Sequence, residues 1–509
     1  QHINLQNNNL KIYPYDPPTE LKFHFQFENN SFNSLVHLKS LYLTDNNFNE
    51  ISENIFRSLE RLEQLFLIHD QVREIHSGAF RHLKMLVLLN ASENQLTQLK
   101  KAVFKNLFNL EELYLSKNRI SIIEPHCFED LTRLKILDLS NNPLNVIQSN
   151  TFKLEELNLE INVFPAETLK SFKLPNLKEL KLSHNSFPDI PENAFSNFRH
   201  LQILHLKDCK ISSISEKALR SSNLLKLHLD KNQLRDLPDR VFRDVPSLKE
   251  LYLNDNLFKG IPEKAFEGLK NLETLEISNN IHVTPNRSNL SFLFEINLGS
   301  NTLNSLPFNF FNSLNGTVRI LNLSFNRFAN LSNFKEYSLM IEELTLQRTN
   351  LSIITSSDFS FKNLARLLSL DLGYNRIDFI PKERFYGLAD LKLLNATQNL
   401  ISRLDEFPKN LKSLETLDLS YNKIEKISEG AFNNLDNLNE LYLYGNWISA
   451  ISPDAFSPPK KLKLLDISRN NLQNLAGHPP PTQGKTHKID ENQYRHSQIS
   501  NKHFQPFCL

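Results

Sequence analysis

Hydrophobic positions recur along this chain at intervals of about 24 residues. Leu110, Leu113 and Leu115 in "LEELYLSKNRI" return as Leu134, Leu137 and Leu139 in "LKILDLSNNPL". The alternation in LxL places two leucines on one face of a short strand, and stacked strands of this kind form a parallel sheet. Each repeat therefore predicts one short strand, followed by a turn that returns the chain to the start of the next strand.

A polar residue follows each LxL at a fixed distance, in the pattern LxxLxLxxN. Asparagine carries a donor and an acceptor on a short side chain, so we expect it to satisfy buried backbone groups of neighbouring turns. Only Asp70, Cys209 and Thr349 replace it. The positions of this ladder, about 21 in number, are Asn8, Asn30, Asn46, Asp70, Asn94, Asn118, Asn142, Asn162, Asn185, Cys209, Asn232, Asn256, Asn280, Asn301, Asn326, Thr349, Asn375, Asn399, Asn422, Asn446 and Asn470.

Most repeats continue after the ladder residue as xLxxIxxxaFxxLxx, for example "NQLRDLPDRVFRDVPSL" from Asn232. The phenylalanine of this half-repeat recurs as Phe56, Phe80, Phe104 and Phe128, among others. We expect these rings to stack as a second apolar column behind the sheet, with a structural role.

The repeat resembles that of extracellular leucine-rich repeat proteins of the 24-residue (typical) subclass, and is similar to those of chaoptin and Toll-like receptor ectodomains. The resemblance implies an α/β repeat fold, a leucine-rich repeat solenoid shaped as a curved horseshoe. Its parallel β-sheet lies on the concave face, and short helical or irregular segments lie on the convex face. Family members usually carry cysteine-rich caps at both ends, so we expect this chain to be a fragment, with caps, signal peptide and any anchor outside it.

Breaks in the period set the predicted domain organisation. We predict one solenoid over residues 1–476, with about 21 repeats and irregular stretches at 11–37 and 281–350. Residues 477–509 are polar, contain several prolines and have no repeat, so we predict a disordered polar tail.

Composition and motifs argue against several classes of function. The 58 Lys and Arg residues balance 57 Asp and Glu, for a net charge of +1, so we expect no nucleic-acid partner. No apolar run is long enough for a membrane span, so we expect no membrane insertion by this segment. The cysteines Cys127, Cys209 and Cys508 have no metal-binding spacing, and catalytic motifs are absent. We therefore predict that the chain is not an enzyme and has no metal or cofactor.

The residue between the two leucines of LxL should face outward and is free to vary. Acids occupy this column late in the chain, at Asp371, Asp418 and Asp466. Aromatic and basic residues occupy it earlier, and exposed aromatic side chains on a rigid sheet are typical anchors of protein interfaces. A plain preference of these residues for strands is the alternative. The candidate protein-binding residues are Tyr42, Phe66, Tyr114, Lys181, His205, His228 and Tyr252.

Four of these candidates, Lys181, His205, His228 and Tyr252, fall on successive strands and should form one stripe. We expect like charge from Lys181 and the nearby Lys207 to discourage protonation of the two histidines.

N-glycosylation sequons concentrate between residues 286 and 350, in the irregular stretch. An NxS/T sequon favours a surface position in a secreted protein. The predicted glycosylation sites are Asn286, Asn289, Asn315, Asn330 and Asn350.

These features favour a non-enzymatic protein-binding leucine-rich repeat ectodomain, extracellular or at the cell surface, which serves cell adhesion or receptor recognition through its concave or lateral face. The expected partner is a protein ligand or a second leucine-rich repeat solenoid, and a homodimer is possible. An intracellular leucine-rich repeat scaffold or regulatory subunit is the alternative, because the solenoid needs no disulfide.

Overall fold

The computed structural model describes residues 2–4, 32–146, 154–220, 223–281, 293–306, 310, 316–328, 340–352, 361–404, 406–457 and 459–472. The chain divides into two compact units, unit 1 (residues 1–297) and unit 2 (residues 298–509). The predicted tail over 477–509 and much of the predicted irregular stretches lie outside the described residues.

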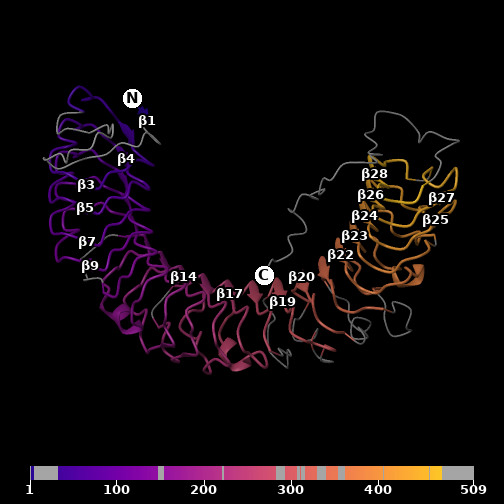
Figure 1. Cartoon of the computed structure of the whole chain (residues 1–509). Helices are drawn as coiled ribbons and strands as arrows, with labels where there is room; N and C mark the ends of the chain where they lie inside the picture. The colour runs from indigo at the N-terminus through magenta and orange to yellow at the C-terminus, as the bar shows by residue number, and fades with distance from the viewer. Residues whose placement is uncertain are drawn as a thin grey trace. The chain divides into compact units, whose positions relative to one another are not determined.

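Unit 1 is a solenoid of stacked turns, as predicted, with one short strand from each turn in a parallel sheet (Figure 1). Adjacent strands pair in register, so equivalent repeat positions become neighbours; Leu113 lies beside Leu137, for example. The strands, in the order of the sheet, are β1 (His2–Asn4), β2 (Ser40–Tyr42), β4 (Gln64–Phe66), β6 (Leu88–Asn90), β8 (Glu112–Tyr114), β10 (Ile136–Asp138), β11 (Glu156–Asn158), β12 (Glu179–Lys181), β14 (Ile203–His205), β16 (Lys226–His228), β17 (Glu250–Tyr252), β18 (Thr274–Glu276) and β19 (Glu295–Asn297).

Unit 2 has the same construction, again with parallel pairing in register. Its strands are β20 (Ile320–Asn322), β21 (Glu343–Thr345), β22 (Ser369–Asp371), β23 (Leu393–Asn395), β24 (Thr416–Asp418), β26 (Glu440–Tyr442) and β28 (Leu464–Asp466).

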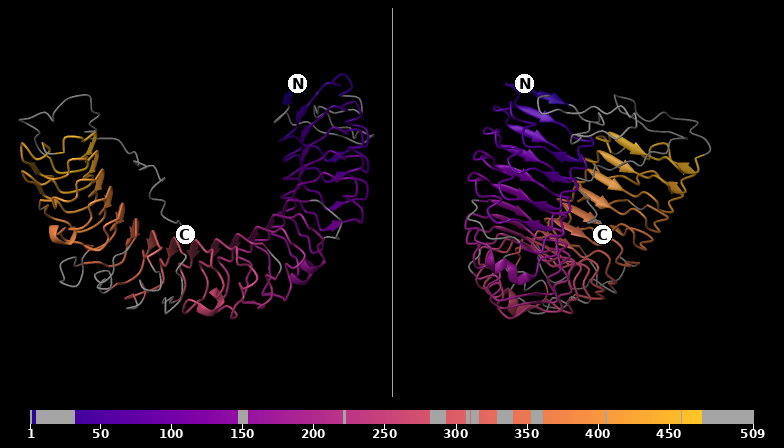
Figure 2. Two further views of the ribbon diagram at one scale, coloured as in Figure 1. Left: turned by 180° about the vertical axis from the view of Figure 1, so that it is seen from behind. Right: turned by 60° about the vertical axis from the view of Figure 1, so that its left-hand side comes forward.

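The opposite side of the turns carries little regular structure. Two-residue strands pair there in parallel, β3 (Glu50–Ile51) with β5 (Glu74–Ile75), β7 (Gln98–Leu99) with β9 (Ile122–Ile123), β13 (Asp189–Ile190) with β15 (Ser213–Ile214), and β25 (Lys426–Ile427) with β27 (Ala450–Ile451). Short 3₁₀ helices replace them at η1 (Ala166–Ser171), η2 (Glu263–Phe266) and η4 (Lys382–Arg384). In unit 1, the pairs β3–β5 and β7–β9, labelled in Figure 1, lie across the turns from the main sheet; Figure 2 shows the stacked turns from two further sides.

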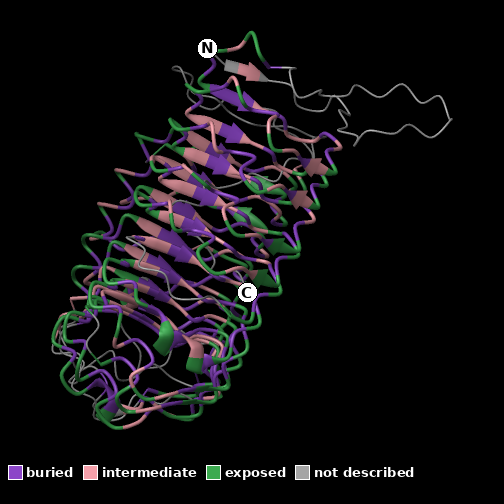
Figure 3. Ribbon diagram, turned by 90° about the vertical axis from the view of Figure 1, so that its left-hand side faces the viewer, coloured by how far each residue is buried: buried purple, intermediate pink, exposed green. Residues whose placement is uncertain are grey.

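The core runs through each turn between these two sides. In β8 the middle residue, Leu113, is buried and its two neighbours are half-buried. Most strands of unit 1 repeat this pattern, which Figure 3 shows as banding. Behind the leucines, phenylalanine rings stack from turn to turn. The ring centroids of Phe56 and Phe80 are 6.1 Å apart, and those of Phe80 and Phe104 are 6.4 Å apart. The predicted second apolar column is thus confirmed for these residues.

The ladder asparagines join successive turns. Asn118 donates from Nδ2 to the carbonyl oxygen of Ala91 in the preceding turn (3.0 Å) and to that of Leu115 in its own turn (3.0 Å). Its Oδ1 accepts from the backbone N–H of Leu96 (3.0 Å). One side chain therefore satisfies several buried backbone groups, as the sequence pattern predicts.

The three ladder exceptions differ in what they can donate. The Cys209 thiol donates to the carbonyl oxygen of Leu182 (3.2 Å), and the Thr349 hydroxyl donates to that of Leu346 (2.8 Å). Asp70 accepts from the backbone N–H of Asn46 through Oδ1 (2.7 Å), but its buried Oδ2 has no hydrogen-bond partner in the part of the chain that the structure describes. This oxygen takes the place of the amide nitrogen that donates in the other turns.

Candidate protein-binding surface

The predicted stripe on unit 1 is a contiguous row. Parallel pairing places Lys181 of β12 beside His205 of β14, His205 beside His228 of β16, and His228 beside Tyr252 of β17. The rings of His205 and His228 stack with centroids 4.6 Å apart and planes 7° apart. His228 stacks in turn on Tyr252, at 4.3 Å and 10°. The structure therefore brings these four residues together.

Acidic side chains hold the histidines of the row. Glu179 Oε1 lies 3.0 Å from His205 Nε2. Asp230 lies 3.5 Å from Nδ1 of His228 through Oδ1 and 3.1 Å from Lys207 Nζ through Oδ2. Each histidine of the row therefore has a carboxylate beside it, and Asp230 also pairs with Lys207.

The ends of the row are held in the same way. Lys181 pairs with Glu156 and, at 3.6 Å, with Glu179. Tyr252 donates from its hydroxyl to Glu250 (2.7 Å). Every member of the row is therefore fixed by at least one polar contact or ring stack.

His205 is harder to protonate than a free histidine, as predicted, but for a different reason. Burial in the stack lowers its pKa, and repulsion from His228 lowers it further, against the opposing effect of Glu179. Lys181 and Lys207, which we expected to act, are paired with carboxylates instead. Asp230 is also buried, which raises its pKa, but its contacts with His228 and Lys207 outweigh burial and leave that pKa below the usual value.

The other candidate residues lie on earlier strands of unit 1. Tyr42 of β2 and Phe66 of β4 stack with centroids 4.4 Å apart and planes 4° apart. Tyr114 of β8 is not part of this pair, because Asn90 of β6 lies between Phe66 and Tyr114. Its hydroxyl donates to Glu112 (2.8 Å). The aromatic candidates therefore form one stacked pair and one separate ring.

The acidic column of unit 2 does not form the exposed stripe that alternation predicts. Asp371 is buried, with 1% of its surface exposed, and accepts from the backbone N–H of Gly373 (2.9 Å) and from Asn395 Nδ2 (3.0 Å). Burial raises its pKa to about 6. The outward positions Glu276 and Asn297 of unit 1 are also buried, at 3% each. Neighbouring side chains cover these positions although they point away from the core.

Of the predicted glycosylation sites, the structure describes Asn350 and places it at an exposed position. Asn286, Asn289, Asn315 and Asn330 lie outside the described residues.

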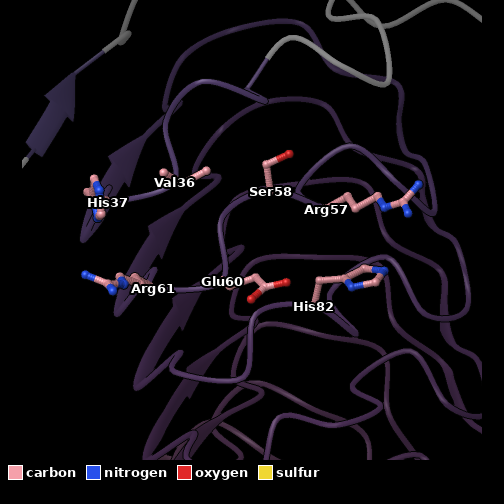
Figure 4. Close-up of a pocket in the computed structure, with 7 residues that line it drawn as sticks. All are labelled: Val36, His37, Arg57, Ser58, Glu60, Arg61 and His82. Atoms are coloured by element: carbon pink, nitrogen blue, oxygen red, sulfur yellow. The ribbon is translucent and has the colours of Figure 1, made fainter.

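Other kinds of site find little support in the structure. The described residues contain no group of three or more His, Cys, Asp or Glu side chains that could hold a metal ion. None of their helices has the length and hydrophobicity needed to cross a membrane. An open depression of about 570 Å³ lies on unit 1, but its side chains spread over successive turns without converging (Figure 4). Its lining residues are Val36, His37, Arg57, Ser58, Glu60, Arg61 and His82.

Sequence reasoning missed the acids that support the row. Glu156, Glu179 and Glu250 each begin a strand, one position before its buried leucine. The signal was present in the recurring "EL" that opens these strands, but the outward column alone does not include it.

Comparison with known proteins agrees with this geometry. The profile of the Leucine rich repeat family matches residues 36–96, 92–144, 152–211, 222–281, 339–401 and 412–472. Comparison with curated proteins gave no match.

Among solved structures, the chain is similar to a Leptospira interrogans leucine-rich repeat protein, with 26% identity and a TM-score of 0.58, over 78% of this chain and 94% of that one. It is also similar to a chain of the Drosophila Toll–Spatzle complex, with 20% identity and a TM-score of 0.61, over 88% and 76% of the two chains. A chain of the mouse RP105/MD-1 complex gives 21% identity and a TM-score of 0.60, over 92% and 82%.

The two complexes support the fold alone, because each is less than 25% identical to this chain. The family profile covers more than half of the sequence, and its matches fall on the turns described above. The chain belongs to the leucine-rich repeat family.

Proposed function

We propose that this chain is a non-enzymatic recognition module, extracellular or at the cell surface, which binds a protein partner through the strand face of unit 1. The observation that carries the proposal is the row Lys181–His205–His228–Tyr252, a three-ring stack whose polar neighbours are all on the same face. Aromatic anchors at the centre of a polar surface are typical of protein interfaces. Because the sheet and the stacking hold the rings in place, little side-chain freedom would be lost on binding.

The similar structures support a protein as the partner. Two of them are structures of complexes, Toll with Spatzle and RP105 with MD-1. A second copy of this chain remains a candidate partner, although the burial of Asp371 removes one of the acids that such a contact could use. The intracellular scaffold is the competing proposal, and occupied N-glycans on Asn350 after expression in a secretory host would favour the extracellular one.

We expect Tyr252→Ala to weaken binding of the partner by about 30-fold, the loss typical of one interface hot spot. The tagged chain is first screened against an array of secreted and cell-surface proteins, and each hit is then titrated against the wild-type chain and the variant by surface plasmon resonance. Loss of the Tyr252 ring removes both the end of the stack and the support of His228.

Tyr442→Ala is the matched control. Tyr442 occupies the equivalent outward position on β26 of unit 2, and its hydroxyl donates to Glu440 (3.1 Å) as that of Tyr252 donates to Glu250. The control should bind like wild type. Equal losses in the two variants, or no loss in Tyr252→Ala, would show that the row is not the interface.

A further inference from the structure

One edge of unit 2 differs in chemistry from the same edge of unit 1. In each turn, the residues just before and just after the ladder position lie where the chain leaves the strand. We call this side of unit 2 the aromatic edge, and it is formed by Phe325, Arg348, Tyr374, Arg376, Tyr421, Lys423 and Trp447. Its aromatic side chains are well exposed, with fractions of 46% for Phe325, 42% for Tyr374, 45% for Tyr421 and 49% for Trp447.

Arg348 and Lys423 of the aromatic edge lie on its rings. The guanidinium of Arg348 lies between two rings, 5.4 Å from the ring centroid of Phe325 and 4.7 Å from that of Tyr374. The ammonium of Lys423 lies 5.5 Å from the ring centroid of Trp447. Such contacts fix the position of a cation without neutralising its charge.

These cations have no acidic partner among the residues that the structure describes. Neither Arg348 nor Lys423 forms an ion pair with any described residue, and the same holds for Arg327 and Arg376 on the same edge. The sequence has no Asp or Glu immediately before or after any ladder residue of unit 2.

At the same repeat positions, unit 1 has ion pairs between neighbouring turns. There, the residues before the ladder pair with one another from turn to turn, as Lys117 does with Glu93 (2.8 Å) and His69 with Asp45 (2.7 Å). The excess positive charge on the aromatic edge is therefore a property of unit 2 and not a consequence of the repeat.

We propose that the aromatic edge of unit 2 is a docking site for an acidic segment of a partner protein. The carboxylates of the segment would pair with Arg348, Arg376 and Lys423, and its apolar side chains would pack on the exposed Tyr421. The planar guanidinium matches a carboxylate with two parallel hydrogen bonds. A single-stranded nucleic acid fits less well, because it needs open ring faces for base stacking, and cations already cover those of Phe325, Tyr374 and Trp447.

The test uses the single tryptophan of the chain, Trp447, whose emission reports directly on the edge. The full chain is titrated with a synthetic peptide of alternating Glu and Phe residues, and separately with an oligothymidylate of equal charge. All titrations use an Asn350→Gln background, because a glycan at that sequon would lie on the same edge. We expect saturable binding of the peptide with a change in Trp447 emission, and an affinity about tenfold lower in Arg348→Gln/Arg376→Gln.

The control variant Lys117→Gln/Arg119→Gln removes the same number of charges from the same repeat positions in unit 1 and should bind the peptide like the parent. An equal loss in this control, or no saturable change in Trp447 emission, would overturn the proposal. Tighter binding of the oligothymidylate than of the peptide would identify the edge as a nucleic-acid surface and would also overturn it. The result is independent of the row on unit 1, which Tyr252→Ala tests separately.

Discussion

Asn232→Ala is expected to lower the free energy of unfolding by about 2 to 6 kcal/mol, from about 1 to 3 kcal/mol for each of two orphaned N–H groups. Asn232 Oδ1 accepts from the backbone N–H of Cys209 (2.9 Å) and of Ile211 (2.9 Å). Its Nδ2 also donates to the carbonyl oxygens of Leu206 (2.8 Å) and Leu229 (2.9 Å). These groups are buried in the native structure, so truncation leaves them without the amide that pairs with them and away from bulk solvent.

The measurement is urea denaturation followed by circular dichroism, with amide hydrogen exchange to locate the loss. Gln202→Ala is the control, because Gln202 is exposed in the same region of unit 1. We expect its midpoint to match wild type, whereas Asn232→Ala should lose exchange protection at Cys209 and Ile211. Equal midpoints for the two variants would refute the assignment of the ladder as the structural spine.

The second large effect has the opposite sign: Asp70→Asn should stabilise the chain at neutral and alkaline pH. Burial raises the pKa of Asp70 to about 7, from an ordinary value of 3.8. A proton on the buried Oδ2 gives Asp70 the donor that asparagine supplies in other turns. We therefore expect the folded chain to hold Asp70 protonated below about pH 7.

The sign of the pH dependence follows from that shift. Because the folded pKa lies above the unfolded one, the contribution of Asp70 to stability is complete below pH 3.8 and is lost as pH rises towards about 7. A difference of about three between the folded and unfolded pKa values corresponds to about 4 kcal/mol in the free energy of unfolding. Denaturation at pH 5 and pH 8 should therefore show Asp70→Asn gaining most at pH 8, where the wild-type carboxyl is ionised.

Asn94→Asp provides the mirror-image control. Asn94 is the next ladder residue and donates from Nδ2 to the carbonyl oxygens of Leu67 and Ala91 (2.6 and 3.1 Å). We expect this variant to be destabilised at pH 8 and to recover towards pH 5. If Asp70→Asn has the same stability as wild type at both pH values, the buried-acid interpretation of Asp70 is wrong.

The fold could be predicted from the sequence because the same pattern of apolar and polar positions recurs in nearly every repeat. The leucines of LxL, the ladder asparagines and the Phe56–Phe128 column each occupy the positions that the period predicts. The row from Lys181 to Tyr252 was also predictable, since in-register parallel pairing converts equal repeat position into contact. Its role in binding stays a prediction.

The burial of individual side chains on the strand face could not be predicted from the sequence. Asp371 and Glu276 occupy outward positions by alternation, yet they are buried because neighbouring side chains close over them. The pairing of Lys181 with Glu156 likewise depends on how far the Lys181 side chain extends from β12 towards the neighbouring strand β11, and the spacing of residues in the sequence does not encode that distance. The aromatic edge was missed for a simpler reason, since it follows the residues next to the ladder and not the centre of the strand.

The ladder also determines how a protein of this kind can change its length. Asn118 contacts its own turn and the turn before it, and Asn142 repeats the arrangement by donating to the carbonyl oxygen of Leu115. Removal of one complete turn leaves each remaining asparagine with an equivalent neighbour, whereas removal of part of a turn breaks the register on both sides. Duplication and loss of whole repeats are thus the changes that evolution can make most easily here, and recognition surfaces on the outside are lengthened or shortened in steps of one strand.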